Sequence, residues 1–230
     1  MRSGTVRIFV VTLAMFASLT ACATKSASTK SASTTSTAAS SPSGQCHYAK
    51  TAQAAAKDVG IPPSALASPA AQTATLTTNH GVVTLRLNTA AAPCTVNSFT
   101  FLASKHYFDS TPCHRLTTSG IFVLQCGDPT GTGAGGPGYQ FADENLRGAT
   151  YPAGTVAMAN AGPGTNGSQF FLVYADTRLA PNYTPFATMV SGLDVVQKIA
   201  AAGSDNSNGS GDGAPLLPTT IVQLVATPSS

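Results

Sequence analysis

Alternating apolar and polar positions between residues 70 and 87 predict a pair of β-strands. Two runs, TATLTT and GVVTLRL, alternate with a period of two, and turn residues at 79–81 separate them. The face that we expect to be buried carries Leu76, Val83, Leu85 and Leu87. Strand-like runs recur at TVAMAN (155–160), SQFFLVYA (168–175) and TTIVQLVA (219–226), so we expect a mainly β chain.

Apolar residues recur at helical spacing in two segments. Val96, Phe99 and Leu102 follow a proline that suits the first turn of a helix. The run VVQKIAAA (195–202) follows the sequence SGLD (191–194), which predicts a capping box at the start of a second helix. Many short strands with two helices predict a closed antiparallel β-barrel whose open ends the helices cover.

The first 22 residues indicate an export signal. Two arginines precede an apolar run, 8–17, that is too short to span a bilayer. The run leads to Leu-Thr-Ala-Cys, which resembles the bacterial lipobox, so Cys22 is the expected lipidation site. The alternative is an ordinary signal peptide whose cysteine falls near the cleavage point. We expect an exported protein whose N-terminal lipid anchors it to the extracytoplasmic face of a bacterial cell membrane.

The rest of the chain divides into three parts. Residues 23–44 contain only Ala, Ser, Thr, Lys, Pro and Gly, and with no large apolar side chain to bury they predict a flexible tether. Residues 45–69 form an N-terminal extension, for which a short helix is one interpretation. Residues 70–230 are long enough for one domain with a substantial core.

Four cysteines follow the tether, and an even number in an exported protein fits two disulfides with three possible connectivities. They are Cys46, Cys94, Cys113 and Cys126. Cys113 and Cys126 flank a predicted hairpin and could face each other across it. The chain has no C-x-x-C spacing and its 4 histidines are scattered, so we expect no metal site.

Charge and motif context argue against two classes of ligand. Without the two arginines of the signal, 12 − 2 = 10 Lys and Arg face 9 Asp and Glu, a net charge of about +1. So small a charge gives no electrostatic reason to expect nucleic acid as a partner. The sequence G-x-G-x-x-G occurs at 131–136, but no helical pattern follows it, as a dinucleotide site would require.

Two stretches, CHRL…GIFVLQCGD (113–128) and MANAGPGTNGSQFF (158–171), resemble the cyclophilins, which are peptidyl-prolyl cis-trans isomerases. The loop sequence GDPTGTGAGGPGYQFADEN (127–145) supports the likeness, which covers about residues 73–227. The resemblance implies a closed eight-stranded antiparallel β-barrel capped by two α-helices, with an active groove on its outer face. It also implies isomerase activity on proline-containing polypeptides, with no cofactor and no metal.

A prolyl isomerase has to lower one rotational barrier. Rotation about an X–Pro bond is opposed by ~18–20 kcal/mol of amide resonance, while the cis and trans forms differ by only ~0.5–1 kcal/mol. A hydrogen-bond donor aimed at the proline nitrogen gains strength as conjugation is lost, so it stabilises the twisted state. Arg115 is the candidate donor, because a guanidinium stays charged and can also steer the carbonyl before the proline.

The resemblance places polar groups around this arginine. Gln125 and Gln169 would anchor the guanidinium or the substrate carbonyl. Ala159 and Asn160 would offer backbone groups to the residues before the proline, as an added strand does. His114 should point away from Arg115 on a strand, which favours a packed histidine over a general base.

An apolar pocket for the proline ring is expected beside these groups. Alternation in the second hairpin strand places Val123 on the same face as Gln125, whereas Phe122 joins them only by its position in the family. The expected catalytic set is Arg115, Gln125 and Phe122. The expected pocket is Phe122, Val123, Phe171, Leu179 and Tyr183.

The sequence departs from the cyclophilin pattern around this pocket. The loop between Arg115 and Phe122 is one residue pair longer than usual, and Val123 replaces a methionine. Arg178 takes the place of a tryptophan that contacts cyclosporin in many members, and Tyr183 that of a pocket histidine. These two changes predict weak cyclosporin binding, and we separately expect the protein to be a monomer. The alternative to an enzyme is a proline-peptide-binding or holdase module of the same fold with little turnover.

Overall fold

The computed structural model of the chain describes residues 44–68 and 70–228. The predicted signal peptide with Cys22, and the tether up to residue 43, lie outside the described residues. Among the residues described, no helix has the length and apolar character needed to cross a membrane.

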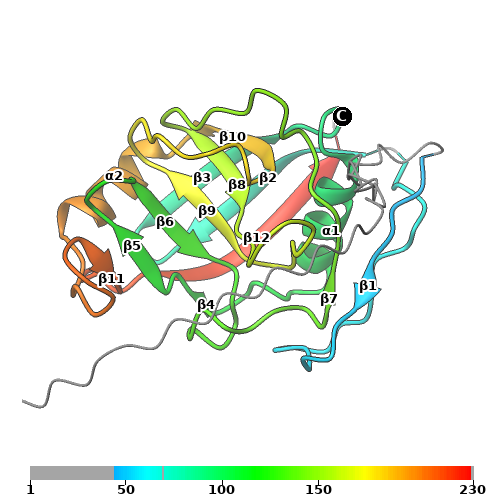
Figure 1. Ribbon diagram of the computed structural model, residues 1–230, viewed down its shortest axis with the longest axis horizontal. Helices are drawn as coiled ribbons and strands as arrows, with labels where there is room; N and C mark the ends of the chain where they lie inside the picture. Colours follow the sequence, from blue (N-terminus) through cyan, green and yellow to red (C-terminus); the bar gives the residue numbers. More distant parts are fainter. Residues whose placement is uncertain (1–43, 69, 229–230) are drawn as a thin grey trace, which may run out of the picture. The chain divides into compact units, whose positions relative to one another are not determined.

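Ten strands form one curled antiparallel sheet, in the order β11-β5-β6-β9-β8-β10-β3-β2-β12-β4. In Figure 1, β5, β6, β9 and β8 pass in front of β3, β2 and β12. The strands are β2 (Ala71–Thr78), β3 (Gly81–Leu87), β4 (Thr111–Pro112), β5 (Arg115–Thr117), β6 (Val123–Cys126), β8 (Thr155–Met158), β9 (Phe170–Val173), β10 (Pro185–Ser191), β11 (Asp212–Gly213) and β12 (Thr220–Pro228). The prediction of a mainly β chain is confirmed.

The expected closed eight-stranded barrel is not confirmed, because the strand order is open and ends at β4 and β11. Residues 111–117 change partners along their length. Thr111 and Pro112 pair with β12, whereas Arg115 to Thr117 pair with β6. Cys113 and His114 lie between the two ladders, and Cys113 donates its N–H to Thr219 O at 2.9 Å. The segment therefore forms two short strands, β4 and β5, with different partners.

Both predicted helices are present. Helix α1 (Pro93–Ser104) starts at its proline and buries Val96, Phe99 and Leu102. Helix α2 (Leu193–Ala201) has no side-chain cap, so the predicted capping box is wrong. Its N-cap is Gly192, with φ at +82°, and a Cβ atom there would overlap the carbonyl of Val82. The close approach to β3, rather than a hydroxyl cap, therefore fixes where α2 begins.

The main core lies between the inner face of the sheet and the helices. The alternation in β2 and β3 is confirmed, since Leu76, Val83 and Leu85 are fully buried. The ring of Phe99 in α1 packs edge-on against Phe170 of β9 at 5.5 Å between centroids. Apolar packing of this kind joins strands that lie far apart in the sequence.

Residues 45–68 form no helix, so the short helix considered for the extension is not found. Instead, β1 (Ala49–Lys50) pairs with β7 (Tyr139–Gln140) as a separate two-stranded ladder. A disulfide joins Cys46 to Cys94 in the first turn of α1. The alanine-rich run favours a helix by local propensity, but pairing with another part of the chain overrides it.

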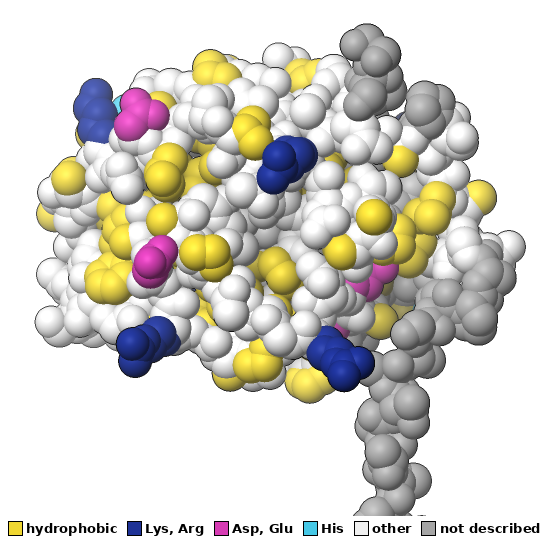
Figure 2. All heavy atoms as spheres, turned by 90° about the horizontal axis from the view of Figure 1, so that it is seen from above, with side chains coloured by type: hydrophobic (Ala, Val, Ile, Leu, Met, Phe, Trp, Pro, Cys, Tyr) yellow, Lys and Arg dark blue, Asp and Glu magenta, His cyan; other side chains and the backbone are white. Residues whose placement is uncertain are grey.

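The surface carries little charge. Figure 2 shows one face, on which the Lys and Arg side chains stand apart from one another among hydrophobic and uncharged atoms. Charged residues make up 9% of the chain. So few charges produce only a weak long-range electrostatic field.

Candidate active site

Four neighbouring strands bring the predicted polar and apolar groups into one row. Arg115 of β5 lies opposite Gln125 of β6, Gln125 lies opposite Phe171 of β9, and Phe171 lies opposite Ala157 of β8. Directly paired residues in a sheet project their side chains from the same face. The row therefore places a guanidinium at one end, an aromatic ring further along, and an amide between them.

A carboxylate that the sequence analysis missed holds the guanidinium. Asp212 of β11 accepts Arg115 Nε–H at 2.8 Å and Nη2–H at 2.6 Å. This bidentate contact fixes both the position and the plane of the group. Hydrogen bonding to Asp212 raises the pKa of Arg115 and, in turn, lowers that of Asp212.

A line of side-chain amides continues from Arg115. Arg115 Nη1–H donates to Gln125 Oε1 at 3.3 Å, and Gln125 Nε2 donates to Gln169 Oε1 at 2.8 Å. Gln169 Nε2 in turn donates to Gly133 O and Gly135 O, each at 2.9 Å. Contacts with the described residues use three of the five N–H groups of the guanidinium, and the other two have no partner among those residues.

The glycine-rich loop that receives Gln169 is built around one buried carboxylate. Asp128 accepts hydrogen bonds from the backbone N–H groups of Thr130, Gly133 and Gly135 at 2.8–3.0 Å. Burial raises the pKa of Asp128, but hydrogen bonds from the Thr130 hydroxyl and from these backbone N–H groups outweigh it and lower the pKa below 3.8. A Cβ atom at Gly135 would overlap the Asp128 carboxylate, so glycine is required there. The loop carbonyls that face Gln169 are therefore held in place.

A second apolar cluster, which we call the outer cluster, includes Phe171 and Ala157 of this row and is separate from the main core. Its members come mainly from the row's strands and the loops around them. The Phe171 ring packs edge-on against Tyr183 at 5.5 Å between centroids. The buried members are Val123, Tyr151, Ala157, Phe171 and Val173, and the partly buried ones are Ile121, Ala149, Ala159, Leu179 and Tyr183.

The outer cluster includes most of the predicted pocket but not Phe122. The Phe122 side chain packs against the main core, with its ring 6.0 Å from that of Tyr174. Phe122 precedes Val123 by one position, and strand alternation sends the two side chains to opposite faces. Ile121 joins the outer cluster instead.

Of the remaining predicted groups, Ala159 belongs to the outer cluster. Ala159 donates its N–H to Gln169 O at 3.0 Å, which extends the β8–β9 pairing by one step. Asn160 donates through Nδ2 to Asn182 O at 2.8 Å, so its side chain braces the neighbouring loop. His114 has a buried ring whose nitrogens have no hydrogen-bond partner among the described residues. Burial, opposed by Asp128 and aided by Arg115, lowers its pKa, so it stays neutral at pH 7.

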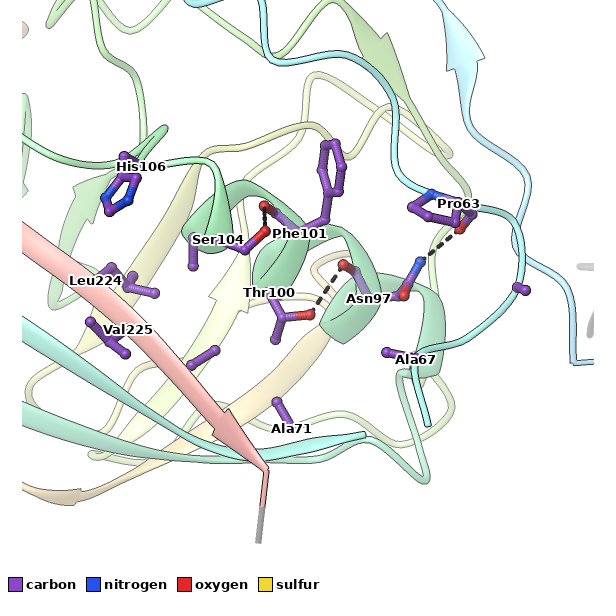
Figure 3. A pocket seen from close by; sticks show the side chains of 13 residues that line it. Pro63, Ala67, Ala71, Asn97, Thr100, Phe101, Ser104, His106, Leu224 and Val225 are labelled. Carbon is purple, nitrogen blue, oxygen red and sulfur yellow. Dashed lines mark hydrogen bonds between the residues drawn. The ribbon is translucent and has the colours of Figure 1, made fainter. Parts of the chain in front are cut away.

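Of two cavities in the protein, the first adjoins this site and the second does not. One, of about 390 Å³, is lined by Gln125, Gln169, Ala159 and Asn160 together with the glycine-rich loop. The other, of about 520 Å³, lies between α1, β12 and a segment that contributes Pro63, Ala65, Ala67 and Ala71. Figure 3 shows the Phe101 and Leu224 side chains that line it. None of the groups in the row that begins at Arg115 lines this second cavity.

Comparison with known proteins agrees with this geometry. Residues 73–225 match the family model described as cyclophilin type peptidyl-prolyl cis-trans isomerase/CLD. The chain is 47% identical over 195 residues to the probable peptidyl-prolyl cis-trans isomerase B of Mycobacterium leprae, covering 78% of this chain and 65% of that protein. It is 45% identical over 196 residues to the Mycobacterium tuberculosis protein of the same description, covering 78% and 63%. The chain thus spans just under two thirds of the length of these relatives.

A solved structure gives the same result. It is a cyclophilin type peptidyl-prolyl cis-trans isomerase of Cryptosporidium parvum, determined in the presence of the dipeptide Ala-Pro. The TM-score is 0.60 at 29% identity, with 69% of this chain and 100% of that chain covered. The chain belongs to the cyclophilin-type peptidyl-prolyl cis-trans isomerase family.

Proposed function

We propose that the protein catalyses cis-trans isomerisation of X–Pro bonds at the site formed by Arg115 and the outer cluster. The observation that carries this proposal is the fixed guanidinium: Asp212 and Gln125 hold Arg115 in the same row as Phe171. A proline ring bound against Phe171 and Tyr183 would place its nitrogen near the two N–H groups that remain unused. The apolar cluster then supplies binding, and the guanidinium supplies catalysis.

The chemistry needs no bond to be made or broken. As the X–Pro amide twists, its nitrogen loses conjugation and its lone pair becomes a better hydrogen-bond acceptor. A preorganised cation gains more from this acceptor in the twisted state than in either planar state, so it lowers the barrier. The bidentate contact with Asp212 means that the guanidinium does not have to be reoriented during the reaction.

The test is the rate of isomerisation of a short X-Pro peptide, followed by exchange NMR. We expect the wild-type protein to accelerate exchange and Arg115→Ala to lose about 10²–10³ of the acceleration, the range found for loss of one preorganised donor. Arg86→Ala, which removes an exposed arginine of β3, is the matched control and should keep the wild-type rate. Equal rates for wild type and Arg115→Ala would refute an enzymatic role for this site.

A proline-peptide-binding module with little turnover is the second candidate, because Tyr183 changes the wall of the outer cluster relative to the family pattern. The two candidates differ in one respect, since a binding module would retain the peptide without accelerating its exchange. Peptide titration beside the rate measurement distinguishes them.

We also propose that the protein is exported, anchored through Cys22, and acts as a monomer on extracytoplasmic polypeptides. The signal-like N-terminus, the lipobox and the two disulfides support this proposal. Replacing Cys22 with Ala should release the protein from the membrane fraction. A Cys22→Ala protein that sediments with membranes as firmly as wild type would refute the lipid anchor.

A further inference from the structure

The N-terminal extension forms one wall of the cavity beside Arg115. Gln125 and Gln169 line this 390 Å³ cavity on the side of the sheet, and Thr51 and Gln53 line it from the extension. The family model matches residues 73–225, so the extension lies outside the part that the family shares. This wall therefore lies outside the part of the chain that the family model matches.

Several contacts hold the extension against the glycine-rich loop. Thr51 donates its N–H to Gly138 O at 3.0 Å, and Ala56 donates its N–H to Gly136 O at 2.8 Å. At Gly138 an added Cβ atom would lie 3.1 Å from that of Ala55, so the two segments pack closely. The disulfide from Cys46 to α1 and the β1–β7 pairing hold the extension just before Thr51. The wall is built into the folded domain.

Gln53 can offer a hydrogen-bond acceptor to a ligand in this cavity. Its Nε2 donates to Ala134 O at 2.5 Å, which orients the amide, and among the described residues its Oε1 accepts no hydrogen bond. Other neutral polar side chains line the same cavity, among them Thr51, Asn160 and Thr165. Among the described residues, no Asp, Glu, Lys or Arg contributes to the lining. A charged side chain that entered would lose water without meeting an opposite charge.

Building on the proposed isomerase function, we propose that Gln53 selects substrates with a neutral hydrogen-bonding side chain, such as glutamine or asparagine, shortly before the proline. Ala159 lines this cavity and also belongs to the outer cluster, and Asn160 and Gln169 line the cavity beside it. A peptide that lays its proline on Phe171 and continues along these residues brings its preceding side chains to Gln53. The amide N–H of such a side chain then donates to Gln53 Oε1.

The test is a panel of X-Pro peptides that carry Ala, Gln, Glu or Lys at the second or the third position before the proline. For the wild-type protein, kcat/KM should be higher for Gln than for Glu or Lys at one of these positions. Gln53→Ala should reduce the Gln preference about 3- to 10-fold, the worth of one hydrogen bond, and leave the rate on the all-Ala peptide unchanged. Gln53→Lys keeps a donor for Ala134 O and should shift the preference toward Glu. Gln223→Ala, at an exposed position of β12, is the matched control.

The outcomes separate this inference from the proposed function. If the wild-type protein fails to accelerate exchange of the all-Ala peptide, the isomerase function itself is wrong. If that peptide is turned over but the Gln53→Ala profile matches wild type across the panel, the role of Gln53 is wrong and the isomerase function stands.

Discussion

Asp212→Asn is the perturbation that most sharply separates a positioned guanidinium from one that is merely charged. The substitution keeps the size of the side chain but removes the charge and turns one acceptor of the two contacts, at 2.8 and 2.6 Å, into a donor. Two opposite charges in contact are worth ~4 kcal/mol at an effective dielectric of 20 and ~1 kcal/mol in water. Because the side chains of Arg115 and Asp212 are 34% and 27% exposed, solvent screening reduces the expected loss of stability to about 1–2 kcal/mol.

The effect on turnover should be larger than this loss of stability suggests. A displacement of ~1 Å at a reacting group can cost ~10²-fold in rate, and Gln125 alone would then hold Arg115. We expect Asp212→Asn to lower kcat by about 10- to 100-fold in exchange NMR, with peptide affinity nearly unchanged because the outer cluster is intact. Asp194→Asn, an exposed carboxylate of α2, matches the charge change and should leave kcat alone. Wild-type kcat in a folded Asp212→Asn protein would refute the positioning role.

Three further predictions concern binding, the start of α2 and acid stability. Tyr183→Ala should weaken binding of an X-Pro peptide about 3- to 10-fold, the worth of one aromatic contact, which a titration measures; unchanged affinity would remove Tyr183 from the pocket. Gly192→Ala should destabilise the fold by about 2 kcal/mol or more in urea, because φ is +82° and the new Cβ would meet Val82, whereas Gly203→Ala meets no such backbone contact. The pKa of His114 is lowered from 6.5 in the folded state. As the pH falls, the His114 ring is therefore protonated in the unfolded chain before it is protonated in the folded protein, and the free energy of unfolding decreases as the pH drops through 6.5. His114→Phe should flatten that slope in urea unfolding between about pH 6.5 and 5, and an unchanged slope would assign it to other groups.

Local patterns predicted the elements of this fold because their causes are local. A period of two suffices to place Leu76 and Val83 on the buried face, and a proline followed by helical spacing suffices to start α1. The start of α2 was predicted for the wrong reason, since the backbone of β3 approaches Gly192 from far away in the sequence. The number of strands and the closure of the sheet depend on which distant strands pair with each other, and a local sequence pattern does not determine that pairing.

The same distinction applies to the site. The family pattern singled out Arg115 and Gln125, which the sheet places opposite each other. Asp212 was missed because it lies 97 residues from Arg115, in a polar loop whose composition predicts only solvent exposure. Phe122 was assigned by family position, and its placement in the main core follows from alternation relative to Val123. Gln53 was missed because its segment favours a helix by propensity, and only pairing with the glycine-rich loop brings it to the cavity.

The most direct test of the central claim is kcat of Arg115→Lys at saturating peptide. Lysine preserves the positive charge but offers no planar fork, so it cannot hold Asp212 and Gln125 while donating to the proline nitrogen. We predict that kcat falls at least about 10-fold, with the affinity for the peptide close to that of wild type. A kcat equal to wild type would show that charge alone suffices and would contradict a fixed guanidinium as the origin of catalysis.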